Sequence, residues 1–303
     1  MSTRGQANTF RTLSDEVQQG HSIRIPIYER LSKHLGGRVV ISYFTSFMWE
    51  GTIADSDADM IEEVLQNTPI NGKELILVIN SPGGDGLAAE RIINIFRSYS
   101  PNGFSVIVPK MAKSAATMIC FGAKKILMSK TSELGPIDPQ IAIFDDNGKF
   151  SGYQAAHEII NSYEGLMARA SKTKGRIEPY LQQLARFDDR SIQRIKSAQA
   201  LSESIAVKCL KTGCMSNLEE RQIRVKIKPF LDPKFTKDHG RPIYYDVARS
   251  SGLATELADH NSELWKDVWC LYVRLNFLVS SSASKVIESS TEAYTAPARL
   301  REH

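Results

Sequence analysis

The chain has 303 residues, of which 42% are hydrophobic and 24% are charged, proportions that are typical of a globular protein with a sizeable core. Its formal net charge of +4 is too small to indicate a nucleic-acid partner. The four cysteines show no metal-binding spacing, so we expect reduced thiols in the core and neither a metal nor another cofactor.

The N-terminal part of the chain is polar and of mixed charge. It lacks the apolar stretch of a secretion signal, and no run in the sequence approaches the roughly 18 apolar residues of a membrane span. We therefore expect a soluble, cytoplasmic protein. Residues 1–35 are expected to form an N-terminal arm that is extended or partly helical.

A strand and a helix are expected next. The segment Val39–Phe44 is typical of a strand. The acid-rich piece Asp55–Asp59 lacks the central glycine and the distal glutamate of a calcium loop. We interpret it as the approach to a helix over Ala58–Gln66, because acidic side chains complement the positive end of the helix dipole.

The next part of the sequence repeats one pattern twice. Leu75–Ile79 is an apolar run typical of a buried strand, and a Pro-Gly-Gly turn and a helix from about Gly86 follow it. Phe104–Val108 predicts a second strand, followed by a short loop and a helix that begins at Ser114. Strand, turn and helix in succession indicate a parallel sheet with both turns at its carboxyl edge, where such folds bind ligands.

The two turns offer complementary chemistry. Gly83 and Gly84 have no Cβ, so a substrate backbone can approach their amides closely. Ser114 stands where a helix begins, near free backbone N–H groups and the positive end of the dipole. A hydroxyl facing such amides has the geometry of acyl transfer. The structural alternative is that Ser114 is only an N-cap and the diglycine only a tight turn.

The second half of the chain is expected to be mainly helical. After the serine helix, the pattern predicts a short strand over Lys125–Met128, a loop over Ser132–Gln140 and a hairpin tip at Asp145–Lys149. Helices are predicted from Tyr153, over Glu178–Arg186, over Ser191–Gly213 and, with an amphipathic stripe, over Ser262–Phe277. The polar run from Ser280 to the C-terminus is expected to be disordered.

One basic stretch, Asn217–Arg241, has several interpretations. Its charged side chains surround Pro229 and Pro233; they are Arg221, Arg224, Lys226, Lys228, Lys234 and Lys237. Such a stretch is usually a solvated surface. The alternatives are that it binds an acidic partner or nucleic acid, or that it forms a lid over the serine.

Three motifs carry a resemblance to a known family. They are Asn80–Asp85, Lys113–Thr117 and the segment Leu134–Gln140, which contains Gly-Pro-Ile-Asp-Pro-Gln. In this order and spacing they resemble the Clp peptidase/crotonase superfamily, and most of all its branch with signal peptide peptidase A and the serine dehydrogenase proteinases. A weaker resemblance extends over residues 38–252.

The resemblance implies a fold and a domain organisation. The fold would be α/β, with the repeated β-β-α spiral of the Clp/crotonase type around a parallel sheet, plus a helical C-terminal extension. After the arm at 1–35, the catalytic core would span 36–213. A basic loop or lid with a short α/β segment would occupy 214–260, and an amphipathic helix and flexible tail 261–303. Relatives form rings or layered oligomers, so a homo-oligomer is expected.

The resemblance also implies an activity. Relatives of this type are serine peptidases that cleave polypeptides without ATP. Ser114 would be the nucleophile, and the amides of Gly84 and Ala115 would hold the oxyanion. Gly83 and Asp85 would complete the substrate-binding turn.

The general base stays open at this point. The histidine of Clp peptidases would fall near Asp138, and the lysine of signal peptide peptidase A would fall in Tyr153–Ala156; neither base is present there. Lys149, Asp138 and His239 are the candidates. Lys113 adjoins the serine but, on a helix, would point about 100° away from it.

Two further functions use the same fold. A non-catalytic protein would grip an extended peptide in the same groove, as a scaffold or binding module. A crotonase-like enzyme would hold an acyl-thioester between the same amides, although that chemistry does not require a serine.

Overall fold

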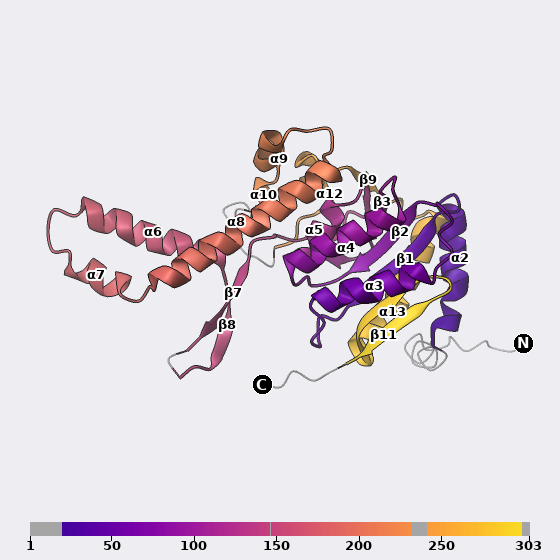
Figure 1. Ribbon diagram of the computed structural model, residues 1–303, viewed down its shortest axis with the longest axis horizontal. Helices are drawn as coiled ribbons and strands as arrows, with labels where there is room; N and C mark the ends of the chain where they lie inside the picture. Colours follow the sequence, from indigo (N-terminus) through magenta and orange to yellow (C-terminus); the bar gives the residue numbers. More distant parts are fainter. Residues whose placement is uncertain (1–19, 146, 232–240, 299–303) are drawn as a thin grey trace, which may run out of the picture.

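The computed structural model describes residues 20–145, 147–231 and 241–298 (Figure 1). Its body is a seven-stranded sheet in the order β11-β10-β1-β2-β3-β5-β9. Five of its strands, β1, β2, β3, β5 and β9, run parallel to one another, whereas β10 and β11 extend the sheet antiparallel to their neighbours. The bounds of the strands are β1 Val39–Thr45, β2 Leu75–Asn80, β3 Phe104–Val108, β5 Ile126–Met128, β9 Thr255–Leu257, β10 Ala283–Glu288 and β11 Ala293–Pro297. The predicted α/β fold with a parallel sheet is confirmed.

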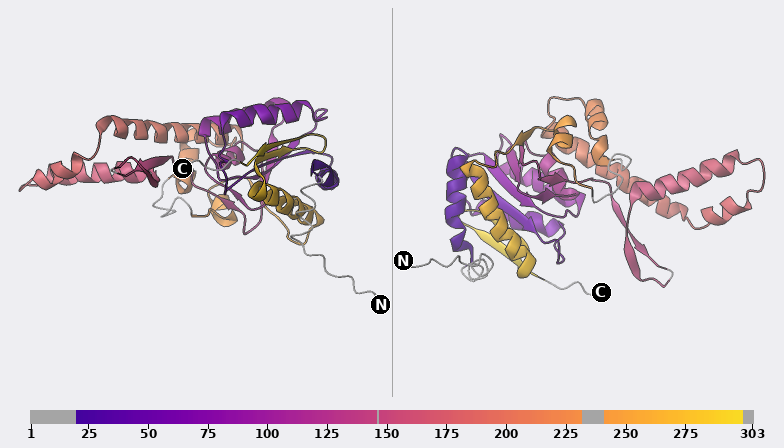
Figure 2. Two further views of the ribbon diagram at one scale, coloured as in Figure 1. Left: turned by 90° about the horizontal axis from the view of Figure 1, so that it is seen from below. Right: turned by 180° about the vertical axis from the view of Figure 1, so that it is seen from behind.

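Helices cover both faces of this sheet. In Figures 1 and 2, α2 and α13 lie on one face, and α3, α4 and α5 lie on the other. Successive residues of β1 point to opposite faces, so Ile41 belongs to one apolar core and Val40 to the other. The bounds of these helices are α2 Ile25–His34, α3 Asp55–Gln66, α4 Gly86–Tyr99, α5 Ala115–Phe121 and α13 Glu263–Ser281. Because both faces are covered, every residue of β2 is buried, which explains its unbroken apolar run.

A hairpin and three helices extend away from the body (Figure 1). The antiparallel strands β7 (Gln140–Phe144) and β8 (Phe150–Ala155) form the hairpin. The helices α6 (Ala156–Lys172) and α7 (Glu178–Leu184) follow, and α8 (Asp189–Thr212) runs back to the body, where it packs on α4 and α5. The predicted hairpin tip is therefore confirmed, but the predicted helix begins at Ala156 because residues 153–155 continue β8.

The described part of the basic stretch contains two short helices, α9 (Glu220–Lys226) and α10 (Lys228–Leu231), whereas Lys234 and Lys237 lie outside the described residues. Ile223 of α9 and Phe230 of α10 are fully buried, and Phe230 stacks edge-on against Phe121 of α5 with the ring centroids 5.1 Å apart. The charged side chains therefore lie on the outer side of the helices. The short helix α12 (Tyr245–Ser250) precedes β9. The short elements that remain are the 3-10 helix η1 (Gly20–Ile23) and the paired strands β4 (Met111–Ala112) and β6 (Glu133–Leu134).

Two predictions need correction. The helix predicted from Ala58 begins at Asp55, because Asp57 is buried and accepts a hydrogen bond from the hydroxyl of Tyr43 (2.6 Å) and one from Lys285 Nζ (2.6 Å). The tail predicted to be disordered from Ser280 is wrong for residues 283–297, which form β10 and β11. The end of β10 carries the buried Glu288, to which Arg24 Nε donates a hydrogen bond (2.8 Å). The local composition of a segment cannot predict partners that are so distant in the sequence.

None of the helices in the described ranges has both the length and the apolar composition that a bilayer crossing requires.

Candidate active site

Ser114 stands at the sharp turn between β4 and α5. Its backbone has φ 49° and ψ −119°, in a region that residues with a Cβ rarely adopt. Such a conformation costs about 1–3 kcal/mol and persists where the surrounding structure enforces it, often at functional sites. The side chain does not cap the helix. Ser114 therefore occupies the N-cap position without a capping bond from its side chain.

The helix behind Ser114 is held rigidly in the core. Every residue from Ala115 to Phe121 is buried. Thr117 fixes the first turn, because its hydroxyl donates to the carbonyl of Ala112 (2.7 Å) and accepts from the amide of Gly135 (3.0 Å). The small side chains that the sequence places here let the helix pack closely against its neighbours, so Ser114 has little freedom to relax.

The diglycine turn packs directly against the serine. Gly83 has φ 100°, and a Cβ added to it would lie 2.7 Å from Ser114 Cβ and 3.1 Å from the amide nitrogen of Ala115. The amide of Ile53 donates to Gly83 O (2.8 Å) and the amide of Asp85 donates to Ile53 O (2.9 Å). Gly84 stands between these two bonds, so its own N–H points away from Ile53.

Two amides beside the serine are left without an acceptor. In the described part of the chain, neither Gly84 N–H nor Ala115 N–H donates a hydrogen bond. The hydroxyl of Ser114 likewise has no hydrogen-bond partner among the described residues, although it is not sealed from solvent. A free hydroxyl thus lies beside two free backbone donors, which are the components of an acyl-transfer site.

A small cavity of about 190 Å³ opens beside Ser114. Its walls come from the diglycine turn, α5, the loop before β7 and α8. The apolar part of the wall consists of Leu87, Met118, Ile137, Pro139, Ala198, Leu201 and Ile205. Ser202 of α8 ties the loop in place, because its hydroxyl donates to Ile137 O (2.6 Å). Such a cavity suits an apolar side chain next to the serine.

Asp85 has a structural task at this site. Its Oδ1 accepts a hydrogen bond from the amide of Leu87 (2.7 Å) and so caps α4. Asp85 lines the cavity, but its amide is bonded to Ile53 rather than free.

Among the described residues, neither Lys149 nor Asp138 forms a hydrogen bond with Ser114. Lys149 lies on the exposed tip of the projecting hairpin (Figure 1), and its amide donates to Asp145 Oδ1 (2.9 Å). His239 lies outside the described residues. Lys113, next to the serine, forms an ion pair with Glu133 (2.7 Å).

Asp138 contacts a histidine that the sequence analysis missed. Asp138 is 1% exposed and lies between Ile137 and Pro139, which line the Ser114 cavity, but Asp138 itself does not line it. Its Oδ2 lies 3.6 Å from Nδ1 of His157, on the first turn of α6. One signal was available, since His157 directly follows the segment in which the family resemblance places a lysine.

The thiols and the metal-ligating side chains point to no second reactive centre. Burial raises the pKa of Cys209 and of Cys214 to about 12, and raises that of Cys120 well above its usual value. These thiols therefore stay protonated at neutral pH. Throughout the ranges that the structure describes, no three histidine, cysteine, aspartate or glutamate side chains are grouped to hold a metal ion.

The comparison with known families agrees with this geometry. Residues 41–168 match the family model of the ClpP-like SDH-type serine proteinases. This match agrees with the resemblance that the three sequence motifs carry.

Two proteins of Methanocaldococcus jannaschii are similar in sequence. The uncharacterized protein MJ0137 is 37% identical over 89 residues, which are 29% of this chain and 30% of that protein. The uncharacterized protein MJ1495 is 28% identical over 120 residues, 40% of each chain. The chain thus spans less than half the length of these curated relatives.

One solved structure to which this chain is similar is that of the 1510-N membrane-bound stomatin-specific protease, in a mutant form. It is 16% identical, with 76% of this chain and 84% of that chain covered and a TM-score of 0.36.

Proposed function

We propose that this protein is an ATP-independent serine peptidase in which Ser114 is the nucleophile. The observation that supports this proposal is the conformation of Ser114: a strained residue at a helix start, with a free hydroxyl, packed against Gly83 and beside two free amides. The match of residues 41–168 to a serine proteinase family supports the same chemistry.

In the proposed reaction, Ser114 Oγ attacks the carbonyl carbon of a peptide bond while its proton passes to a base. The amides of Gly84 and Ala115 stabilise the oxyanion. The C–N bond then breaks, the leaving amine takes up a proton, and an acyl-serine remains. A water molecule attacks this ester in the second half of the reaction and restores the free hydroxyl.

Three proton acceptors are candidates for the base. Lys149 and His239 follow from the sequence, and the third candidate is the pair of His157 and Asp138, in which Asp138 would orient the imidazole. The pH dependence of acylation separates them in part. A histidine base gives a rise near its ordinary pKa of about 6.5, and a lysine must lose a proton first, so its rise falls at higher pH.

Labelling with a fluorophosphonate probe tests the nucleophile. The probe is expected to modify the wild-type protein and the control variant Ser98→Ala, whose hydroxyl lies on the exposed side of α4, but not Ser114→Ala. Mass spectrometry of the digested protein locates the adduct. Labelling that persists in Ser114→Ala would show that the nucleophile is another residue.

One observation favours a second candidate function. Because no described side chain of the same chain accepts the proton of Ser114, the groove would also serve a protein that binds extended peptides without cleaving them. Peptide binding with no labelling at any pH would favour this scaffold. Affinity for acyl-CoA would instead favour crotonase-like chemistry.

The proposed enzyme acts as a homo-oligomer. Three aromatic side chains on the projecting hairpin, Phe144, Phe150 and Tyr153, are exposed and contact each other edge-on, with centroid distances of 6.1 and 5.1 Å. An isolated two-stranded hairpin is marginally stable in water, so a second copy that covers these rings would stabilise it. Sedimentation analysis is expected to show a smaller particle for Phe150→Ser than for the wild type. A monomeric wild type would contradict this proposal.

A further inference from the structure

A second and larger cavity lies beside another face of α8. Its volume is about 730 Å³, which is within the range of ligand sites in proteins. Helix α8 contributes Leu201 and Ile205 to the Ser114 cavity but Gln199 and Glu203 to this one. The remaining walls come from α6, α9 and α10, and their lining residues are His157, Asn161, Glu220, Arg221, Arg224, Val225, Lys228 and Leu231.

The spacing of the residues on α9 and α10 directs positive charge into this cavity. Arg221, Arg224 and Lys228 follow one another at intervals of three and four, which places them on one side of the two helices. Ile223 of α9 and Ile227, between the two helices, point away from the cavity and are fully buried in the core. The apolar residues thus fix which way the cations face.

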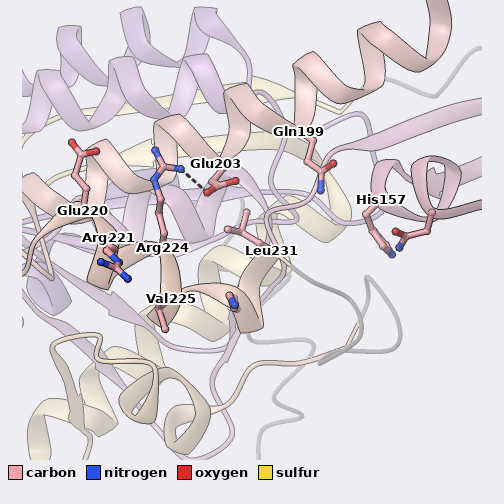
Figure 3. A pocket seen from close by; sticks show the side chains of 10 residues that line it. His157, Gln199, Glu203, Glu220, Arg221, Arg224, Val225 and Leu231 are labelled. Carbon is pink, nitrogen blue, oxygen red and sulfur yellow. Dashed lines mark hydrogen bonds and ion pairs between the residues drawn. The ribbon is translucent and has the colours of Figure 1, made fainter. Parts of the chain in front are cut away.

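Two of these cations have no partner in the described part of the chain. Arg224 is paired, because its Nη1 lies 2.5 Å from Glu203 Oε1 (Figure 3). Arg221 and Lys228 form no ion pair or hydrogen bond with any described residue. With Glu220 as the other acid in the wall, the lining has three cations and two carboxylates. The cavity therefore favours a ligand with negative charge.

The other end of the cavity is lined by an imidazole and two side-chain amides. Figure 3 shows His157 and Gln199 toward one end and Arg221 and Arg224 toward the other. The side-chain amides of Gln199 and Asn161 make no hydrogen bond within the described ranges, and Nδ1 of His157 is buried without one. Amide side chains both donate and accept, which suits a peptide backbone.

We propose that this cavity binds an acidic segment of a polypeptide, whose carboxylates pair with Arg221 and Lys228 and whose backbone bonds to Gln199 and Asn161. Two features distinguish such a ligand from nucleic acid. The carboxylates of Glu203 and Glu220 would repel a run of phosphates, and the described lining holds no phenylalanine, tyrosine or tryptophan on which successive bases would stack. This binding goes beyond the proposed peptidase activity and does not depend on it.

Fluorescence anisotropy with the full chain tests the proposal. The probes are a fluorescein-labelled peptide of alternating aspartate, glutamate and leucine, and its analogue with asparagine and glutamine. All proteins carry Ser114→Ala, so that cleavage cannot affect the reading. The acidic peptide is expected to bind, and its amide analogue is expected to bind at least about tenfold more weakly. Salt at about 0.5 M is expected to reduce this difference in affinity.

The decisive variant combines Arg221→Gln with Lys228→Gln. It is expected to weaken the binding of the acidic peptide by about tenfold or more. The matched control is Lys172→Gln with Lys174→Gln, which removes the same charge from exposed positions around the end of α6 and is expected to bind like the parent. Circular dichroism checks that both pairs fold. Equal binding by the two pairs, or by the two peptides, would overturn the proposal. Tighter competition by a single-stranded oligonucleotide than by the acidic peptide would also overturn it.

Discussion

Nδ1 of His157 lies 3.6 Å from Oδ2 of Asp138, directly behind the loop that lines the Ser114 cavity. The carboxyl of Asp138 is almost completely buried, and the amide of Gln140 reaches it only weakly, at 3.4 Å. A buried carboxylate depends on such neighbours, because it has lost its hydration.

The first prediction concerns this pair. His157→Gln is expected to destabilise the protein by about 1–3 kcal/mol, since the buried carboxyl of Asp138 loses the imidazole whose Nδ1 lies 3.6 Å from its Oδ2. Asp138→Asn is expected to cost less in the His157→Gln background than in the wild type, because the two side chains interact. Urea unfolding of the four proteins measures this coupling; additive effects would contradict the interaction. If the labelling of Ser114 in His157→Gln has the same pH dependence as in the wild type, the pair of His157 and Asp138 is not the base.

The second prediction uses the backbone of Ser114. With φ 49° and ψ −119°, this position suits a residue without a Cβ. Ser114→Gly is therefore expected to be more stable than Ser114→Ala by about 1 kcal/mol, although both variants lose the hydroxyl and the fluorophosphonate adduct. Thermal unfolding of the two variants side by side measures the difference. Equal stability would mean that the turn at Ser114 is not strained.

The third prediction concerns the contact between the diglycine and the serine. A Cβ at Gly83 would lie 2.5 Å from the carbonyl oxygen of Lys113, so Gly83→Ala is expected to cost about 3 kcal/mol or more and to abolish labelling of Ser114. The matched control is Gly148→Ala at the hairpin tip, where φ is also positive (76°) but no atom lies within 4 Å. That variant is expected to cost about 1 kcal/mol and to keep the labelling. Denaturant unfolding compares the two, and similar costs would contradict the close packing.

The fourth prediction concerns pH. Burial raises the pKa of Cys209 and Cys214 to about 12 in the folded protein, so these thiols keep protons that the unfolded chain loses above its pKa of about 9. The unfolded state then binds fewer protons, and stability falls as the pH rises. We expect the free energy of unfolding to be constant with respect to these thiols below about pH 9 and to decline from there toward pH 12.

Urea titrations across this range measure the decline. The double variant Cys209→Ala with Cys214→Ala is the control, and its stability is expected to fall less steeply with pH. The buried tyrosines Tyr28 and Tyr43, whose pKa values burial also raises, contribute to the residual slope. An unchanged slope in the double variant would show that the thiols do not contribute.

The sequence predicts the part of the site that depends on neighbours in the chain. The apolar run of β2, the turn at Gly83 and the helix after Ser114 follow from periodicity and turn chemistry, because each is determined over a few residues. The pairing of Asp138 with His157 was not predictable in this way. It requires the hairpin to fold back, so that the amide of Ala156 meets the carbonyl of Pro139 (2.9 Å) before α6 begins.

The same limit explains the two elements that the sequence analysis placed wrongly. Asp57 looks like a surface acid, but Lys285 neutralises it from the far end of the chain. Residues 283–297 look like a polar tail because their serine and glutamate side chains meet their partners, such as Arg24, only in the finished sheet. Composition records the polarity of a side chain and says nothing of a partner so distant in sequence.

The position of β10 on β1 has a consequence for how the protein matures. A ribosome delivers β10, which begins at residue 283, long after β1, which ends at residue 45, so until then the outer edge of β1 has no strand to pair with and Arg24 has no Glu288. An uncovered edge of this kind readily pairs with another nascent chain. Completion of this sheet therefore has to wait for the synthesis of β10, and chains interrupted before residue 283 are expected to aggregate or to require a chaperone.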